Sequence, residues 1–313
     1  MSLVTVLIPT HDHADTLLGA VGSVQAQRHD ELEIFVVGDG VPDRTREIVA
    51  ALEARDPRVR FFDRPKGERH GERHRAEALR HARGRFVCYL SDDDLWLPGH
   101  LGTVLPALEE NDLVHTMVVV ADPEGRLTVG LVDVAAPGYL GRLRANHGGF
   151  GPSCAAHTLD AYRRLPDGWR PAPAGINSDA WMWIQFLEQP WLRATSLAKV
   201  TVLRFPASGR SAWSPARRLV ELDGWWRRIQ EPGGIARLHE GVIEALARER
   251  IGQLDDVRRR LEEELAELAR VRRERDDLAR ALAARPDGGL RSVARGALQR
   301  IGSALRRAPR ARS

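Results

Sequence analysis

The first ninety residues alternate short apolar runs with segments of helical periodicity, and this alternation limits the fold more than any other feature. A helical pattern between two of the runs stops at Gly84, a residue that commonly ends helices. Strands that are apolar along their whole length are buried on both faces, so we predict an α/β fold with a Rossmann-like, mostly parallel sheet sandwiched by helices. The apolar runs are Val4–Ile8, Ile34–Val37, Val59–Phe62 and Phe86–Leu90.

The patterns change twice farther along the chain. Residues 137–175 are rich in Gly and Pro, so we expect mostly loops there. A last strand is expected at Thr201–Phe205, after which the composition indicates a boundary. We therefore predict a domain at 1–210, a linker and helical segment at 211–245, a helical coiled-coil extension at 246–285 and a basic tail at 286–313.

The coiled-coil prediction rests on apolar residues that recur on a seven-residue grid, flanked by Arg and Glu. Glu264 and Arg275 are the two misfits on this grid, which extends over about four heptads. The pattern favours a homodimer formed through the coiled coil, and the alternative is a single helix that folds back on the domain. The grid positions are Leu254, Val257, Leu261, Leu268, Val271, Leu278 and Leu282.

Positive charge is concentrated at the end of the chain. The net charge is +4, but seven arginines between Arg291 and Arg312, with Asp287 upstream, give the tail +6 and leave −2 for the rest. The body is therefore not expected to bind nucleic acid specifically. The tail places apolar residues on one helical face with arginines opposite, which favours peripheral contact with an anionic membrane; a disordered tail is the alternative.

The length and the cysteine content of the chain limit the class of protein to which it can belong. The 313 residues have room for one large domain plus an appendage, and 43% of them are hydrophobic. Two cysteines, Cys88 and Cys154, suit a reducing compartment, and the N-terminus lacks the pattern of a signal peptide. No run reaches the length of a membrane span. We expect a cytoplasmic protein that can associate with a membrane.

The run Tyr89-Leu90-Ser91-Asp92-Asp93-Asp94 places three adjacent carboxylates directly after a buried strand. Like charges repel and burial of a charge is costly, so a hard cation is expected to neutralise the cluster. Mg²⁺ or Mn²⁺, bound by carboxylates and substrate phosphates, meets that need. The alternative is a solvated acidic turn that precedes the next helix.

Two more polar segments follow neighbouring strands. Pro9, Thr10, His11 and Asp12 follow the first strand, and Asp39 follows the second. Asp39 lies between two glycines, so a flat ligand can approach while its carboxylate accepts hydrogen bonds; a tight turn is the alternative. All three segments are expected at one edge of the sheet, where they would hold a nucleotide with its base near Asp39 and its phosphates near the acidic run.

These residues resemble glycosyltransferase family 2. The resemblance is carried by the opening Val6–Leu17, by Ser23–Gln27, by Val37–Gly40 and by Ser91–Pro98, and it covers roughly residues 3–210. It implies a GT-A fold, transfer with inversion, a nucleotide-sugar donor and a divalent metal. The family usually has an aspartate where Gly38 stands and a carboxylate where Ser91 stands.

The resemblance assigns roles to individual residues. Asp39 would contact the nucleotide, Asp93 matches the usual metal-binding position, and Asp94 is the second expected metal ligand. The departure at Ser91 leaves open a shift of the metal ligand by one position. Donor-binding residues would be Pro9, Thr10, His11, Asp12, Asp39, Arg73, Arg75 and Asp92, with Arg73 or Arg75 expected to clamp the diphosphate.

A catalytic base is expected in the segment Asn177–Trp183, which resembles the family's acidic motif before a Trp-containing helix. Asp179 is the candidate base that would deprotonate the acceptor hydroxyl. The alternative is that Asp179 only caps this helix. His70 and His74, four residues apart, form a weaker candidate for a zinc site.

We therefore expect an inverting, metal-dependent glycosyltransferase whose acceptor is a saccharide or a lipid-linked molecule, in surface polysaccharide or glycolipid synthesis. A nucleotidyltransferase is one alternative, although residues 9–16 lack its phosphate loop. Another is a non-catalytic scaffold with the same fold that assembles partners through the coiled coil.

Overall fold

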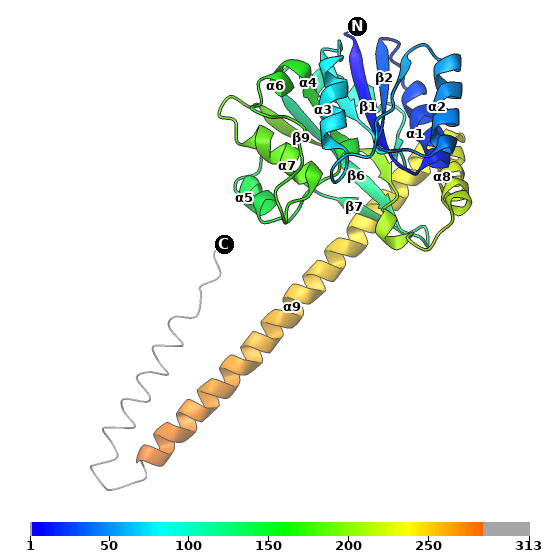
Figure 1. Cartoon of the computed structure of the whole chain (residues 1–313). Helices are drawn as coiled ribbons and strands as arrows, with labels where there is room; N and C mark the ends of the chain where they lie inside the picture. Colours follow the sequence, from blue (N-terminus) through cyan, green and yellow to red (C-terminus); the bar gives the residue numbers. More distant parts are fainter. Residues whose placement is uncertain (1, 284–313) are drawn as a thin grey trace. The chain divides into compact units, whose positions relative to one another are not determined.

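The computed structural model describes residues 2–283, and one mixed sheet organises their N-terminal part (Figure 1). Its first four strands are parallel, in the order β3-β2-β1-β4. Strand β1 continues through Pro9, where the sequence predicted its end, because one missing N–H donor near a strand end is tolerated. The four strands are β1 (Val4–Thr10), β2 (Leu32–Gly38), β3 (Val59–Phe62) and β4 (Phe86–Tyr89).

The sheet extends beyond β4 with both strand directions. Strand β8 (Ala155–Thr158) lies antiparallel between β4 and β6 (Leu113–Ala121), and β9 (Ala194–Arg204) runs parallel to β6. The short strands β5 (Leu95–Trp96) and β7 (Leu127–Gly130) pair antiparallel with β9 and β6. The predicted α/β sheet with covering helices is confirmed, but the sheet is mixed.

Helices connect the parallel strands and cover the sheet. Helices α1 (Ala14–Gln25) and α2 (Asp43–Arg55) contact each other, whereas α3 (Glu72–Arg80) lies in front of the sheet in Figure 1. Helix α4 (His100–Leu108) packs against β6. This arrangement follows from right-handed crossovers between parallel strands.

The segment expected to be mostly loops is partly regular and well anchored. It contains α5 (Tyr139–Arg144), the 3-10 turn η1 (Pro152–Cys154), strand β8 and α6 (Leu159–Arg163), and α7 (Ser178–Leu187) follows it. Buried aromatic side chains hold it, and Phe150 stacks on Trp183 with ring centroids 5.2 Å apart. Glycines and prolines separate these elements, so no single one is long enough to show a period in the sequence.

The region after β9 returns to the domain. It consists of the 3-10 turn η2 (Ala207–Gly209), helix α8 (Pro215–Gln230) and the first turns of α9 (Gly234–Ala283). Helix α8 packs on α1, and a side-chain carbon of Leu222 lies 2.1 Å from where a Cβ on Gly19 would stand. The first compact unit of the chain is residues 1–246.

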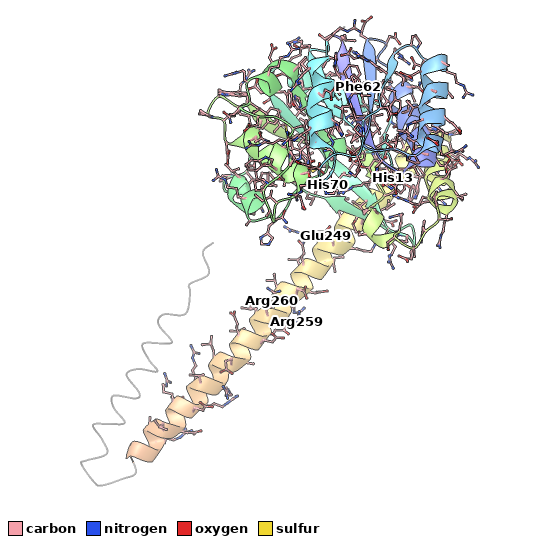
Figure 2. The ribbon with its side chains drawn as sticks, viewed as in Figure 1. His13, Phe62, His70, Glu249, Arg259 and Arg260 are labelled. Carbon is pink, nitrogen blue, oxygen red and sulfur yellow. The ribbon has the colours of Figure 1, made fainter. Side chains whose placement is uncertain are left out.

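The second compact unit begins at Ala247 and contains the rest of α9. Four of its apolar grid residues are exposed, Leu254, Val257, Leu261 and Leu278; Val257 is 64% and Leu261 is 53% accessible. Figure 2 shows the charged side chains of Glu249, Arg259 and Arg260 standing out from this helix. Residues 286–313, the predicted tail, lie outside the described residues. Within residues 2–283, no helix combines the length and apolar character that crossing a bilayer requires.

Candidate active site

The carboxyl ends of β1, β2 and β4 meet at one edge of the sheet. Thr10 pairs with Gly38 across β1 and β2, and Leu7 pairs with Tyr89 across β1 and β4. The loops that follow these strands carry the three polar segments identified in the sequence. This edge is where open α/β sheets bind ligands.

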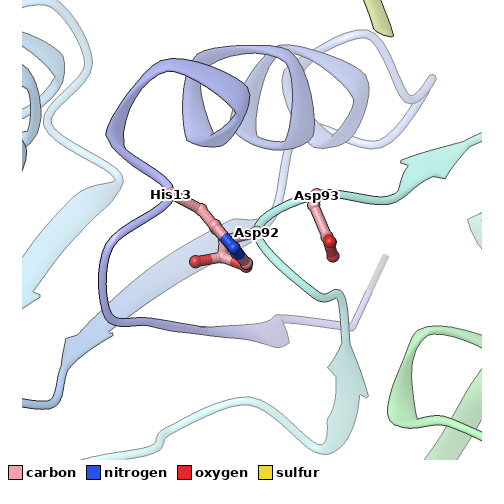
Figure 3. A group of neighbouring side chains, drawn as sticks. All are labelled: His13, Asp92 and Asp93. Atoms are coloured by element: carbon pink, nitrogen blue, oxygen red, sulfur yellow. The ribbon is translucent and has the colours of Figure 1, made fainter. Parts of the chain in front are cut away.

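A histidine and two aspartates converge at this edge (Figure 3). His13, Asp92 and Asp93 each offer one atom that can hold a metal, and these atoms all lie within 4.8 Å of one another. His13 Nδ1 lies 3.0 Å from Asp92 Oδ1. Two carboxylate oxygens, with substrate phosphates as further ligands, suit Mg²⁺ or Mn²⁺, whereas the imidazole nitrogen is a ligand more typical of transition metals.

Asp94, an expected metal ligand, lies elsewhere. Its carboxylate is 2% exposed and accepts hydrogen bonds from Ser153 Oγ at 2.6 Å and from the Phe205 amide at 3.2 Å. These bonds tie the loop after β4 to η1 and to the end of β9. Successive side chains in this turn point in different directions, so only two of the three aspartates belong to the cluster.

The acidic run attracts positive charge. Burial and the neighbouring carboxylates Asp94 and Asp92 raise the pKa of Asp93, and burial likewise raises the pKa of Asp94. The hydrogen bond to Asp92 raises the pKa of His13, against the opposing effect of burial. Burial and carboxylate repulsion both disfavour the ionised form of Asp93, so a cation bound beside it would relieve that repulsion.

Arg218 supplies a cation from the protein itself. This residue lies on α8, and its guanidinium donates through Nη2 to Asp93 Oδ2 at 2.6 Å. Its Nη1 donates to His13 Nε2 at 2.7 Å. Arg218 is 125 residues away from Asp93 in the chain, and no sequence motif predicts the contact between them.

Asp39 is buried in a small polar nest. The Gly67 amide donates to its Oδ1 at 2.6 Å, Lys66 Nζ donates to its Oδ2, and His74 Nε2 lies 3.6 Å away. Burial alone would raise the pKa of Asp39, but these partners lower it, so the carboxylate is ionised. Gly71 has φ +69° and approaches so closely that a Cβ would stand 2.8 Å from the Asp39 carboxyl carbon.

The loop after β1 contributes in several ways. Pro9 and Thr10 end the strand, and the buried Thr10 hydroxyl has no hydrogen-bond partner among the described residues. His11 Nδ1 lies 2.6 Å from the Asp39 carbonyl oxygen, which links the first two loops. The Asp12 carboxylate is 67% exposed and lies 3.5 Å from His13 Nε2.

A cavity of about 460 Å³ surrounds Asp179. Asp179 lies in the first turn of α7, whose N-cap is Asn177, so the alternative that Asp179 caps the helix is wrong. Burial raises the pKa of Asp179, and Arg75 and Arg204 oppose this. Arg204 also lowers the pKa of Asp94, so one guanidinium acts on both the acidic run and the cavity. The cavity lining includes His70, Arg75, Asn146, Phe150, Asn177, Asp179 and Arg204.

The two candidate arginines of α3 have different surroundings. Arg75 is 8% exposed, its guanidinium lies 4.6 Å from the Trp169 ring centre, and its Nη1 is 3.8 Å from Asp179 Oδ1. Its Nε and Nη1 lack a hydrogen-bond partner among the described residues. Arg73 is 75% exposed and lies 3.8 Å from Glu68. The structure thus brings Arg75, but not Arg73, to the cavity.

His70 and His74 belong to two different environments. His74 Nε2 lies 2.9 Å from the Pro65 carbonyl oxygen and faces Asp39, whereas His70 lines the Asp179 cavity. Within residues 2–283, the group of three side chains that could hold a metal is His13, Asp92 and Asp93, and it includes neither His70 nor His74.

The sequence of this domain matches a family model. The model is described as glycosyl transferase family 2, and it matches residues 5–164, just over half of the chain. The chain belongs to glycosyl transferase family 2. The family model covers β1 to β8 and α6. This range includes the Asp39 nest and the group of His13, Asp92 and Asp93, called the acidic cluster below. Asp179 and Arg218 lie beyond the matched residues.

Named relatives of this family 2 member include two glucosyltransferases. It is 32% identical over 110 residues to GalNAc(5)-diNAcBac-PP-undecaprenol beta-1,3-glucosyltransferase of Campylobacter jejuni, which is 35% of this chain and 36% of the relative. It is 29% identical over 113 residues to UDP-Glc:alpha-D-GlcNAc-diphosphoundecaprenol beta-1,3-glucosyltransferase WfgD of Escherichia coli, 36% of this chain and 43% of that enzyme. The aligned segments thus take up less than half of these relatives' lengths.

Solved structures support the fold of this family 2 member. The structure of S. aureus TarS residues 1–349 superposes with a TM-score of 0.52 at 16% identity, covering 70% of this chain and 65% of that one. Its complex with UDP-GlcNAc gives 0.52 at 17% identity, covering 65% and 58%. The GT-A-like fold predicted from the sequence is therefore confirmed.

Two side chains of this family 2 site escaped prediction as functional groups. His13 lies in the motif after β1 but was not assigned a role, because the direction of its side chain depends on the backbone turn that leads into α1. Arg218 lies in a segment read as linker and helix, and only the packing of α8 on α1 brings it to the acidic cluster.

Proposed function

We propose that this chain is an inverting, metal-dependent glycosyltransferase that moves a sugar from a nucleotide-diphosphate donor to an acceptor hydroxyl. The observation that carries the proposal is geometric: the partly exposed Asp179 carboxylate lines a cavity together with Arg75 and Arg204. A base and a cation-binding cluster on the same side of one sheet are the two parts that such a transfer needs.

The donor would lie along the sheet edge. His13, Asp92 and Asp93 would hold Mg²⁺ or Mn²⁺, which supplies neutralising charge to the departing diphosphate. Asp39, with its lowered pKa, would accept hydrogen bonds from the nucleoside, and Thr10 offers a buried hydroxyl with a free hydrogen-bonding position. Exposed Asp12 and Arg73 are the weakest members of the predicted donor set.

The acceptor would enter the cavity of about 460 Å³. Asp179 would remove the hydroxyl proton as the acceptor oxygen forms its bond to the anomeric carbon, on the side opposite to the leaving diphosphate. Arg75 would favour the ionised form of Asp179, because its guanidinium opposes the rise in the pKa of that carboxyl. Attack from the opposite side inverts the anomeric configuration.

The relatives indicate the class of acceptor. The names of the two glucosyltransferases describe lipid-linked saccharides, and another relative, 33% identical over 96 residues, is a putative teichuronic acid biosynthesis glycosyltransferase of Bacillus subtilis. We propose a role in surface polysaccharide or glycolipid synthesis at the cytoplasmic side of a membrane. The arginines between residues 291 and 312 would add attraction to anionic lipids.

Helix α9 would serve as a dimerisation element. Its exposed grid residues, among them Leu254, Val257 and Leu261, form an apolar stripe bordered by ion pairs such as Arg258–Glu262. Burial of such a stripe against a second copy would form a coiled coil.

Donor binding tests the proposal directly. A thermal-shift panel of nucleoside diphosphates, each with and without Mn²⁺, should identify one base that raises the melting temperature only when the metal is present. The gain should vanish in Asp93→Asn and persist in Asp160→Asn, which removes an exposed carboxylate on α6. No stabilisation by any nucleotide, or equal stabilisation without metal, would contradict it.

A further inference from the structure

Arg218 contacts two of the three side chains that could hold a metal ion. Its guanidinium donates to Asp93 Oδ2 at 2.6 Å and to His13 Nε2 at 2.7 Å. A guanidinium has only donors, so the lone pair on His13 Nε2 is taken and the ring carries its proton on Nδ1, facing Asp92. A cation that binds through His13 Nε2 and Asp93 Oδ2 would therefore have to displace Arg218.

The guanidinium is held there firmly. The side chains of Arg218 and Asp93 are 13% and 15% exposed, so water screens the ion pair little. One helical turn farther on, Leu222 is 2% exposed and fills the space above Gly19 of α1. The helix carries its own start signal, because Ser214 accepts a hydrogen bond from the Arg217 amide at 3.3 Å. The position of Arg218 is thus built into the packing of α8.

We propose that Arg218 is a resident cation that competes with the divalent metal for the His13–Asp92–Asp93 cluster. It neutralises the carboxylates in the donor-free enzyme and must leave Asp93 before a metal can bind there. This inference rests on the proposed function, since it concerns the same cluster.

The competition has a consequence for the order of binding. A metal that arrives alone must displace a buried ion pair and leave a guanidinium without a partner, which is costly. A diphosphate that arrives with the metal brings oxygen ligands for the ion and a new anionic partner for Arg218. Metal and nucleotide should therefore bind cooperatively, and the coupling should depend on Arg218.

Titration of Mn²⁺ alone, with free Mn²⁺ followed by electron paramagnetic resonance, tests the competition without any reaction. Arg218→Met keeps the apolar stem of the side chain and removes its charge. This variant should bind Mn²⁺ at least about tenfold more tightly than the wild type. Arg217→Met is the matched control, because Arg217 is an exposed neighbour that stacks on Trp213, 3.8 Å from the ring centre. It should bind Mn²⁺ as the wild type does.

A second titration in the presence of UDP and of GDP separates the possible failures. The nucleotide should tighten Mn²⁺ binding strongly in the wild type and much less in Arg218→Met. If the wild type binds Mn²⁺ with nucleotide but Arg218→Met shows unchanged or weaker affinity for Mn²⁺ alone, the competition is refuted while the metal site stands. If no variant binds Mn²⁺ under either condition, both fail. Arg218→Gln provides a second neutral variant should Arg218→Met unfold.

Discussion

The Arg75 guanidinium lies 3.8 Å from the Asp179 carboxylate, inside the cavity assigned to the acceptor. Burial raises the pKa of Asp179, and Arg75 is foremost among the groups that lower it again. The ion pair therefore sets the pH at which the proposed base is ionised.

Replacement of Arg75 should move the pH profile. A base works only when ionised, so the rate falls as the pH drops through the pKa of Asp179. Arg75→Gln removes a cation that lowers this pKa, so the acidic limb of kcat/KM should shift to higher pH, whereas Arg75→Lys should keep it near the wild-type position. The measurement is kcat/KM against pH, and an unmoved or lowered limb in Arg75→Gln would contradict the assignment.

Neutralisation of Asp179 should abolish transfer but not donor binding. We expect Asp179→Asn to lower kcat by about 10² to 10⁴ fold, the range typical of a lost general base. Calorimetry should give the wild-type Kd for nucleoside diphosphate with Mn²⁺, because the acidic cluster is untouched. Asp160→Asn should keep full activity. A folded Asp179→Asn enzyme with wild-type kcat would rule Asp179 out as the base.

Substitutions at two glycines distinguish the cost of backbone strain from the cost of a steric contact with Asp39. Gly71 and Gly99 both precede helices in the left-handed conformation, with φ of +69° and +87°, but only at Gly71 would a Cβ meet a neighbour. Gly99→Ala should cost about 1–2 kcal/mol of unfolding free energy, the usual cost of that conformation. Gly71→Ala should cost more and also weaken nucleotide binding, measured by urea unfolding and thermal shift. Equal effects would show that Asp39 is not confined by Gly71.

Substitutions at two glycines within α1 test how tightly α8 packs on that helix. A Cβ on Gly19 would stand 2.1 Å from Leu222, whereas a Cβ on Gly22 would meet nothing within 4 Å. We expect Gly22→Ala to stabilise the protein by about 0.5–1 kcal/mol, because alanine favours helices. Gly19→Ala should destabilise it by about 1–3 kcal/mol through overpacking, measured by urea unfolding. Stabilisation by both would mean that α8 does not pack tightly on α1.

The apolar stripe of α9 predicts the oligomeric state. Leu261→Asn places an amide at a core position of the proposed coiled coil and should shift the full chain from dimer to monomer in sedimentation velocity. Arg259→Asn, two residues before it on the opposite face, removes exposed ion pairs with Asp256 and Glu263 and should leave the dimer intact. A wild-type chain that sediments as a monomer at all concentrations would contradict the dimer.

The sequence was a good guide to the parts of the site that follow strands. The apolar runs predicted four parallel strands, and polar residues directly after them necessarily meet at one sheet edge. This logic placed Asp39 and Asp93 correctly at that edge, and it needed no knowledge of side-chain direction. The Trp-containing helix was also expected, but α7 begins at Ser178, so Asp179 lies in its first turn and not before it.

The remaining features depend on tertiary packing. Whether Asp94 faces a metal or Ser153 is decided by the path of the chain through one turn. Whether Arg75 or Arg73 reaches the cavity is decided by which face of α3 is buried. Arg218 reaches Asp93 only because Gly19 admits Leu222. Such contacts join residues that no local pattern connects.

Metal-dependent turnover is the most direct test of the central claim that the acidic cluster holds a cation against a donor diphosphate. The release of nucleoside diphosphate should be measured with the nucleotide sugar whose base is identified by thermal shift. This release should require Mn²⁺ or Mg²⁺ and should fall to background in Asp93→Asn. Asp160→Asn should retain the wild-type rate. Full turnover in a chelator, or in a folded Asp93→Asn enzyme, would contradict the account.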